Sequence, residues 1–213
     1  MTLFHGGDKL PYDGRAAVRA LKKADPALGR LIERVGPFRL QLRGLHTTFE
    51  ALAQSIVYQQ LSGKAAATIL GRVKALFPEE RLAPAHLLQL DETALRAAGL
   101  SGNKQRAMRD LAEKTLGGLV PDVEHLAGLG DDEIVERLTQ VRGIGRWTVE
   151  MMLIFRLGRP DVLPVDDLGV RKGFQIAYRK RALPTPTELA RRGEAWRPYR
   201  SVASWYFWRA TEL

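Results

Sequence analysis

Two adjacent carboxylates, Asp166 and Asp167, are the residues of this chain whose type and spacing most directly suggest chemistry. They precede an amphipathic segment, and Asp is among the best residues for the N-cap of a helix, so helix capping alone explains many such pairs. A cap needs only one Asp. The other could face a junction between two lobes, where the positive end of the helix would favour its ionised form. A carboxylate held in that way can stabilise a sugar cation or activate a water molecule, as in glycoside hydrolysis.

A segment about twenty residues upstream could bind phosphate. Gly143, Ile144 and Gly145 lie between two amphipathic stretches and are flanked by Arg142 and Arg146. Both glycines can take positive φ and allow close approach to the backbone, while Ile144 can fill the gap between two helices. The second helix would begin near Gly145 with unpaired N–H groups facing outward, which binds an anion. Helix–Gly-apolar-Gly–helix is a pattern of DNA binding without sequence specificity; an ordinary turn is the alternative.

The composition agrees with a polyanionic partner and excludes several kinds of site. The chain of 213 residues has 33 Lys and Arg against 24 Asp and Glu, a net charge of +9. A solvated basic surface is the more ordinary explanation of such a charge, and nucleic acid binding is the functional one. The absence of Cys excludes disulfides, Cys-ligated zinc, iron–sulfur clusters and thiol nucleophiles. No signal peptide and no membrane span is recognisable, which predicts a soluble cytoplasmic protein.

Helical periodicity runs through nearly the whole chain and predicts an all-α fold. One stretch, 38–43, alternates apolar and polar residues and is the only strand-like segment. The turn at 95–104 resembles the hairpin but is better explained as an ordinary helix pair joined by glycine. Helices are expected over 16–23, 27–35, 49–61, 63–77, 103–116, 131–141, 147–157, 167–179, 187–193 and 199–213, with two short ones opening at Pro84 and Asp91.

With the hairpin and the acidic pair in this order, the sequence resembles the helix-hairpin-helix DNA glycosylase superfamily. Its signature is a hairpin, a Gly/Pro loop and then an Asp. Within the superfamily, 143–148 and 164–168 look like the DNA-3-methyladenine glycosylase II branch, which repairs alkylated DNA. The flanking segments that agree are Phe49-Glu50, 59–62, 99–101 with Lys104, and 196–201.

The resemblance implies a two-lobed fold with the active-site cleft between the lobes. One lobe is expected over 49–158, with the hairpin at about 131–157, and the other from 1–48 together with 159–213. The chain is similar to short members of the branch, because residues 1–45 are too few for the β-rich N-terminal domain of the longest ones.

The resemblance also assigns roles to residues. The catalytic Asp is the second of the pair, Asp167, which leaves Asp166 as the helix cap and a neighbour of the substrate pocket. The wedge that fills the hole left by a flipped base is Gln60, with Leu61 as the alternative. The remaining positions are the pocket residues Trp147, Met151 and Trp208, with Arg209 beside the last of these, and the DNA-binding hairpin residues Arg142, Gly143, Ile144, Gly145 and Arg146.

Bifunctional members carry a nucleophilic lysine where this chain has Trp147, so the resemblance implies a monofunctional enzyme that uses water. A purine alkylated at N3 or N7 is formally cationic and leaves without prior protonation. The enzyme therefore needs a carboxylate and an aromatic receptor for the base. Cation–π attraction between the receptor and the cationic base contributes about 0.5–2 kcal/mol. Without the resemblance, Trp147 and Met151 would be read as core residues, because i and i+4 share a helix face.

These observations predict a monofunctional glycosylase that flips alkylated purines (the 3-methyladenine and 7-methylguanine class) out of duplex DNA and excises them in base excision repair. Two alternatives remain: a glycosylase for an oxidised or deaminated base, and a non-catalytic helix-hairpin-helix DNA-binding protein. No cofactor, membrane or obligate protein partner is expected, and in a bacterium the protein would associate with the nucleoid. No metal is predicted with certainty, although the hairpin carbonyls could hold a monovalent cation.

Overall fold

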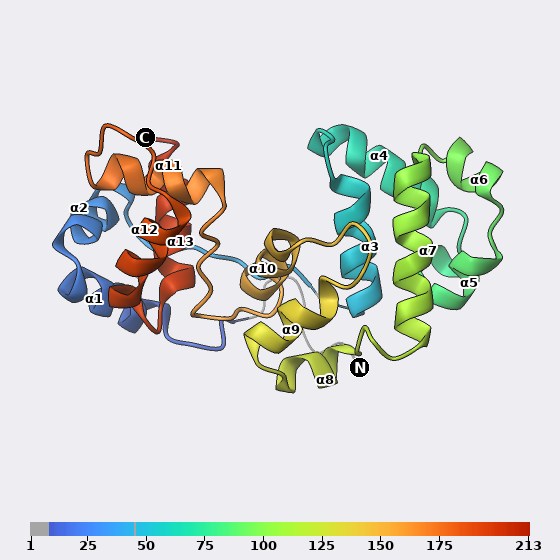
Figure 1. The fold of residues 1–213 in the computed structure, drawn as a ribbon, viewed down its shortest axis with the longest axis horizontal. Helices are drawn as coiled ribbons and strands as arrows, with labels where there is room; N and C mark the ends of the chain where they lie inside the picture. The colour runs from blue at the N-terminus through green and yellow to red at the C-terminus, as the bar shows by residue number, and fades with distance from the viewer. Residues whose placement is uncertain (1–8, 45) are drawn as a thin grey trace. The chain divides into compact units, whose positions relative to one another are not determined.

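The fold is built from helices joined by irregular connections (Figure 1). A computed structural model of the protein describes residues 9–44 and 46–213, and within these ranges it contains no strand. The all-α prediction is therefore confirmed. The helices are α1 (Gly14–Ala24), α2 (Pro26–Val35), α3 (Thr48–Tyr58), α4 (Gly63–Lys74), α5 (Pro84–Gln89), α6 (Glu92–Ala97), α7 (Gly102–Leu116), α8 (Val123–Gly128), α9 (Asp131–Leu138), α10 (Arg146–Phe155), α11 (Leu168–Ala177), α12 (Pro186–Gly193) and α13 (Arg200–Ala210), with 3-10 turns η1 (Pro78–Glu80) and η2 (Glu194–Trp196).

The described residues belong to two compact units. One lies within Leu45–Val149, and the other combines parts of His5–Gly44 and Glu150–Leu213. The chain passes from one unit to the other inside α10, so the hairpin belongs to the first unit and Asp167 to the second. None of the helices in the described ranges is long and apolar enough to cross a membrane.

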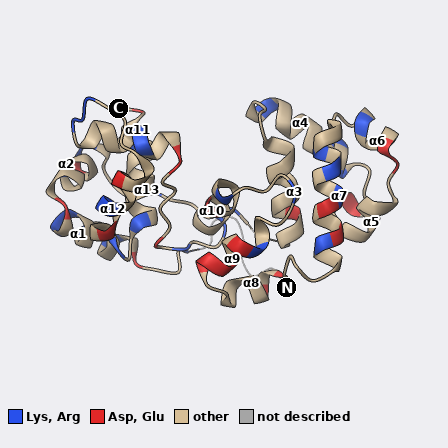
Figure 2. Ribbon diagram, viewed as in Figure 1, with Lys and Arg blue, Asp and Glu red and all other residues tan. Residues whose placement is uncertain are grey.

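Helix α7 organises the first unit, because α3, α5 and α6 all pack against it. Ser101 caps its first turn by accepting a hydrogen bond from the N–H of Lys104. Met108 and Leu111 lie one helical turn apart and are fully buried, as are Leu52 and Ile56 on α3. This apolar stripe leaves the other faces of α7 to charged residues, which Figure 2 shows along the helix.

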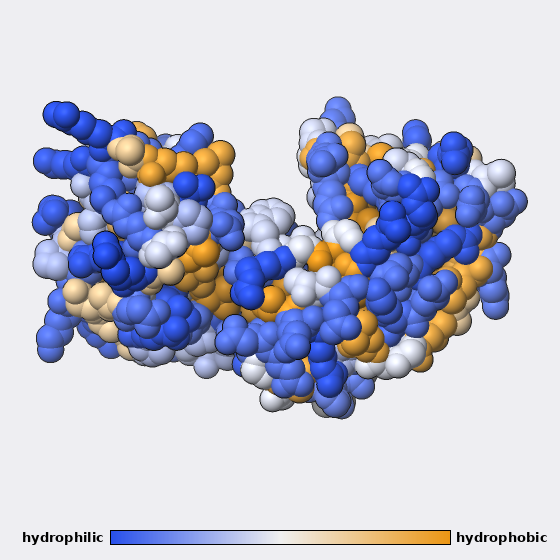
Figure 3. Space-filling model, in the orientation of Figure 1, coloured by the Kyte–Doolittle hydropathy of each residue, from blue (hydrophilic) through white to orange (hydrophobic). Residues whose placement is uncertain are grey.

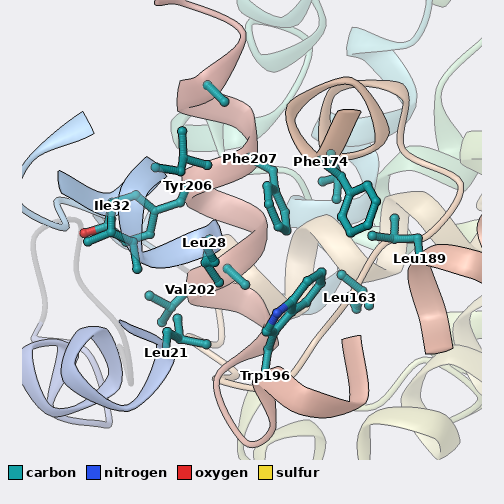
Figure 4. Close-up of a cluster of buried hydrophobic side chains, with 14 of the residues drawn as sticks. Leu21, Leu28, Ile32, Leu163, Phe174, Leu189, Trp196, Val202, Tyr206 and Phe207 are labelled. Carbon is teal, nitrogen blue, oxygen red and sulfur yellow. The ribbon is translucent and has the colours of Figure 1, made fainter. Parts of the chain in front are cut away.

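The core of the second unit depends on a close crossing of α11 and α13. Gly173 allows this approach, since a Cβ at that position would collide with the carbonyl oxygen of Phe207. Phe207 then packs with Phe174 and Trp196, at ring-centroid distances of 5.9 and 5.1 Å (Figure 4). Tyr206 is also fully buried, so most of the aromatic cluster near the end of the chain forms core, as its density in the sequence suggests.

A buried carboxylate fastens the N-terminal helices to this core. Asp25 is fully buried and caps α2 by accepting from the N–H of Leu28 at 3.2 Å. Its Oδ2 accepts hydrogen bonds from the Tyr178 hydroxyl, from Arg192 at 2.6 Å and from Trp196 Nε1 at 3.0 Å. Burial alone raises the pKa of the Asp25 carboxyl, but these donors outweigh it and hold the pKa below its ordinary value.

The strand-like segment 38–43 is not a strand, so that expectation was wrong. The alternation of apolar and polar residues in this segment does match their burial, because Leu40 and Leu42 are buried while Arg39 and Arg43 are exposed. A ladder needs a second strand, and the described residues supply only helices. The N–H of Arg43 instead donates to the carbonyl of Phe155 at 2.8 Å, at the end of α10.

Candidate active site and nucleic-acid interface

Asp167 is fixed at the start of α11 by two hydrogen bonds to one oxygen. Its Oδ1 accepts from the backbone N–H of Val170 at 2.8 Å and from Nε1 of Trp208 at 2.8 Å. The first bond makes Asp167 the N-cap of the helix, so the expectation that Asp166 is the cap was wrong. The physical reason is a turn in which the N–H of Asp167 donates to the carbonyl of Pro164, which leaves Asp166 one residue too early and exposed.

The pair formed by Asp167 and Trp208 requires a glycine beside it. A Cβ at Gly169 would lie 2.8 Å from Cδ1 of Trp208 and 3.1 Å from Oδ1 of Asp167. Gly169 and Gly173 are one turn apart on α11, so the same face that admits α13 also admits this indole. The ring of Trp208 is half-buried and packs against Phe155 at 5.4 Å.

Apolar side chains are exposed on the same helix. Leu168 follows Asp167 directly and is 53% exposed, and Ile176 is exposed two turns further along. Figure 3 shows this hydrophobic surface over α11. The candidate carboxylate therefore stands at the edge of an apolar surface, where water competes less with its interactions than on a polar surface.

The other predicted pocket residues have different surroundings. Trp147 is 52% exposed, which does not fit the alternative that it only packs in the core. Met151 lies one turn further along α10 and is half-buried. Arg209 pairs with Glu212 at 2.7 Å, and its guanidinium lies 5.7 Å from the ring centroid of Trp205.

The hairpin has the geometry expected for an anion-binding turn, with one difference. Gly143 has a φ of +78° and approaches α7 so closely that a Cβ there would lie 3.3 Å from Cβ of Ala107. Gly145 does not take positive φ, so that part of the expectation was wrong. Ile144 is buried, as expected for a residue that fills the gap, while Gly145 and Arg146 are exposed. Among the described residues, the N–H groups of Gly143 and Gly145 have no hydrogen-bond acceptor.

Helix α7 and the end of α3 hold this turn in place. Asp110 accepts from the N–H of Arg142 at 2.6 Å and from Nζ of Lys114 at 2.9 Å, and Lys114 also donates to the carbonyl of Gln140. Burial alone raises the pKa of the Asp110 carboxyl, but these donors hold it below its ordinary value. Gln59 donates from Nε2 to the carbonyl of Gly143 at 2.7 Å. The Arg142 amide is thus not available to a phosphate.

The predicted wedge sits at the tip of a tight turn. Helix α3 ends at Tyr58, earlier than the expected 61, and the N–H of Leu61 donates to the carbonyl of Tyr58. Gln60 has a φ of +57°, a conformation that favours glycine and that costs a residue with a side chain about 1–2 kcal/mol. Both Gln60 and Leu61 are exposed, and Nζ of Lys104 holds the turn by donating to the carbonyls of Val57 and Gln59.

The Gln60 turn, the start of α7 and the hairpin enclose a hollow of about 410 Å³. Its lining includes Gln60, Lys104, Arg142 and Gly143. A wedge candidate, two cations and the exposed hairpin backbone therefore meet in one place in the first unit. Such a surface can receive a phosphate backbone beside an inserted side chain.

The family of the chain follows from comparison with known proteins. A family model described as HhH-GPD superfamily base excision DNA repair protein matches residues 53–198, a range that holds the Gln60 turn, the hairpin and Asp167. The chain belongs to this superfamily. It is 38% identical to the DNA-3-methyladenine glycosylase 1 of Schizosaccharomyces pombe, over 86% of this chain and 82% of that protein. It is 31% identical to the DNA-3-methyladenine glycosylase 2 of Escherichia coli, over 85% and 64%.

Solved structures of the HhH-GPD superfamily share the fold. The Schizosaccharomyces pombe 3-methyladenine DNA glycosylase Mag1, in complex with abasic DNA, is 37% identical with a TM-score of 0.81, over 93% of this chain and 97% of that one. A DNA-3-methyladenine glycosidase from Bacillus halodurans is 36% identical with a TM-score of 0.83, over 97% and 91%. The predicted helix-hairpin-helix glycosylase fold is thereby confirmed.

The sequence does not reveal that Gln59, Asp110 and Lys114 position the hairpin, although Gln59 belongs to the segment 59–62 that resembles the family. They position the hairpin from elements that are far from it in sequence. Asp110 and Lys114 have helical i, i+4 spacing, which predicts an ordinary surface ion pair and gives no sign of the hairpin. The ammonium of Lys104, a residue of the flanking segments that agree with the family, is directed at the carbonyls of Val57 and Gln59 at the end of α3.

The described residues contain no group of three or more His, Asp or Glu placed to hold a metal ion. At the hairpin, the carbonyls of Gly143 and Gln140 already accept hydrogen bonds from Gln59 and Lys114. Each of these bonds leaves its carbonyl oxygen a second lone pair, and a monovalent cation site at the hairpin stays a prediction.

Proposed function

We propose that this protein is a monofunctional DNA glycosylase that removes alkylated purines of the 3-methyladenine and 7-methylguanine class from duplex DNA in base excision repair. The observation that carries the proposal is the Asp167 carboxylate, held by Val170 and Trp208 at the start of α11 in an HhH-GPD chain. The names of its relatives, which are DNA-3-methyladenine glycosylases, support the alkylated purine as the substrate class.

In this proposal the first unit binds the DNA. The exposed N–H groups of Gly143 and Gly145 and the side chains of Arg142 and Arg146 contact phosphates, which positions the protein without reading sequence. Ile144 supports the turn from within. Gln60, or Leu61 beside it, enters the stack where the target nucleotide has left. Flipping costs a few kcal/mol, which the phosphate contacts and the wedge offset.

The chemical step assigned to Asp167 needs no cofactor. As the C1′–N bond breaks, its electron pair neutralises the positive charge of the alkylated base. The carboxylate stabilises the cationic sugar that forms, the oxygen of a water molecule bonds to C1′, and a water proton passes to the carboxylate. The products are the free base and an abasic strand. Trp208 supplies aromatic surface for the cationic base in the second unit, to which Met151 and Asp166 also belong. Trp147 belongs to the first unit and stays a predicted pocket residue.

Release of bases from damaged duplex DNA tests the proposal. Purified protein is incubated with duplexes that contain 3-methyladenine, 7-methylguanine, hypoxanthine or 8-oxoguanine, and the freed bases are separated by chromatography. We expect release of the two alkylated purines. Release of only hypoxanthine or 8-oxoguanine would identify the other glycosylase class, and binding without any release would identify a non-catalytic DNA-binding protein. We further propose that the enzyme is cytoplasmic and that, if its source is a bacterium, it associates with the nucleoid.

A further inference from the structure

A groove on the second unit combines an apolar floor with a basic rim. It has a volume of about 1270 Å³ and runs beside α1, the end of α2 and residues 36–39. Leu10, Val18 and Phe38 are half-buried and supply its accessible apolar surface, and the buried Ile32 and Tyr206 lie beneath them. The floor is therefore made mainly of aliphatic groups and packed rings, which attract apolar side chains from water.

The charges around this groove are unbalanced. Two acidic residues line it: Glu33 pairs with Lys22 at 2.9 Å, and Asp13, which caps α1, attracts Arg15 and Arg19 without forming an ion pair with them. The remaining cations of the lining make no ion pair with any residue in the described ranges. These cations are Lys9, Arg15, Arg19 and Arg39.

The apolar floor favours a peptide over a nucleic acid. Bases bind single-stranded sites by stacking on open aromatic faces. Tyr206 is fully buried, with its hydroxyl donating to the carbonyl of Gly36, and Phe38 already packs against Trp205 and Tyr206 at 5.1 and 6.1 Å. Leu10 and Val18 offer a base no stacking surface, whereas they suit Leu, Ile or Phe side chains.

The groove is separate from the candidate active site. Tyr206 and Trp208 are two residues apart on α13, so their side chains leave the helix in nearly opposite directions. Tyr206 contacts Gly36 and Phe38 at the groove, while Trp208 contacts Asp167 and Phe155. A ligand in the groove leaves the Asp167 side of the helix untouched.

We propose that this groove binds an acidic peptide with bulky apolar side chains, presented by a partner protein. Its carboxylates pair with Lys9, Arg15, Arg19 and Arg39, and its apolar side chains cover the floor. This interaction goes beyond glycosylase activity, and it does not depend on it. It would bring the enzyme to sites where a protein with such a segment is bound.

Fluorescence anisotropy with a labelled synthetic peptide tests the proposal on the full chain. The probe peptide has Glu and Asp around Phe and Leu; one control peptide replaces Phe and Leu by Ser, and another replaces Glu and Asp by Gln and Asn. We expect saturable binding of the probe, and binding weaker by about tenfold or more for each control, since both kinds of contact are needed.

Matched variants locate the binding site. Arg19→Glu combined with Arg39→Glu should weaken probe binding by at least about tenfold, as expected for reversing charges at an interface. Val18→Ser tests the floor in the same way. Arg34→Glu changes an exposed arginine of α2 that does not line the groove, and it should bind the probe like the unmodified protein. All variants should release alkylated bases at the unmodified rate, which shows that they are folded.

Three results would overturn the proposal. The first is no saturable binding of the probe by the unmodified protein. The second is equal binding of the probe and its Ser control, which indicates general attraction to a basic protein. The third is displacement of the probe by single-stranded DNA whose own binding is lost in the Arg19→Glu, Arg39→Glu variant, which makes the groove a nucleic-acid site. None of these results changes the base-release test of the glycosylase.

Discussion

The indole Nε1 of Trp208 donates a hydrogen bond of 2.8 Å to Oδ1 of Asp167, the same oxygen that caps α11. A residue that looked like an aromatic surface for the base therefore also orients the candidate catalytic carboxylate. Hydrogen bonds to a charged group contribute about 1.5–3 kcal/mol, so this contact can decide where the carboxylate points.

Trp208→Phe should separate these two roles. Phenylalanine keeps an aromatic ring but has no N–H donor, so the carboxylate loses one of the groups that fix it. We expect base release to slow by about tenfold or more, with duplex binding nearly unchanged. Single-turnover kinetics and DNA affinity measure the two effects. A variant with an unchanged rate would mean that the hydrogen bond has no part in positioning Asp167.

Asp167→Asn should abolish most base release while leaving the fold intact. Asparagine caps helices as well as aspartate does, and its carbonyl oxygen can still accept from Val170 and Trp208. The variant loses the charge that stabilises the sugar cation and the carboxylate that accepts the water proton. Asp166→Asn is the matched control, because Asp166 is exposed and does not cap the helix. If Asp166→Asn were the inactive variant, the assignment within the pair would be reversed.

Asp110→Ala should weaken binding to duplex DNA by about tenfold, because the Arg142 amide and Lys114 lose the carboxylate that holds the hairpin against α7. Removal of a negative charge near DNA would by itself strengthen binding, so weaker binding identifies the loss of hairpin positioning as the cause. Binding is measured on undamaged duplexes of different sequence across a salt series. All sequences should bind alike, and Arg142→Ala or Arg146→Ala should each lower the salt slope by about one. Tighter DNA binding by Asp110→Ala would contradict a role of Asp110 in positioning the hairpin.

The product should be an intact abasic strand, because tryptophan at position 147 cannot form a Schiff base. Lys104 is the lysine to test as an alternative nucleophile, since burial lowers the pKa of its ammonium. Its two carbonyl acceptors keep it at the end of α3, away from such a role. Borohydride trapping on damaged duplex, followed by a gel without alkali or heat, gives the answer. A covalent adduct that disappears in Lys104→Ala would show that this lysine reaches the sugar.

Asp25→Asn should reduce stability in a way that depends on pH. The pKa of Asp25 is lower in the folded protein than in the unfolded chain, so the carboxylate contributes stability above its unfolded pKa of about 3.9. That contribution is lost as the pH falls through the lower folded value. Asp25→Ala removes the acceptor of the buried Trp196 indole N–H, the part-buried Tyr178 hydroxyl and the exposed Arg192 guanidinium, and it should cost about 1–3 kcal/mol at neutral pH.

Urea unfolding at pH 7 and near pH 3 measures this effect. The difference between the unmodified protein and Asp25→Asn should be large at pH 7 and smaller near pH 3. Asp122→Asn is the matched control, since Asp122 is an exposed helix cap of α8 and Asn caps equally well. Equal losses from Asp25→Asn at both pH values would exclude the buried charge as the cause.

The sequence by itself determined the all-α class, most of the helices and the hairpin, because helical periodicity and Gly-Ile-Gly are local patterns whose physical meaning does not depend on the rest of the chain. It also placed the candidate carboxylate in the pair Asp166 and Asp167. Tertiary structure decided which of the two caps α11, since a turn to Pro164 sets where the helix begins. It decided that 38–43 is not a strand, because no partner strand exists in the described ranges. The bond from Trp208 to Asp167 and that from Asp110 to Arg142 span 41 and 32 residues, and such contacts follow from helix packing, which local patterns do not encode.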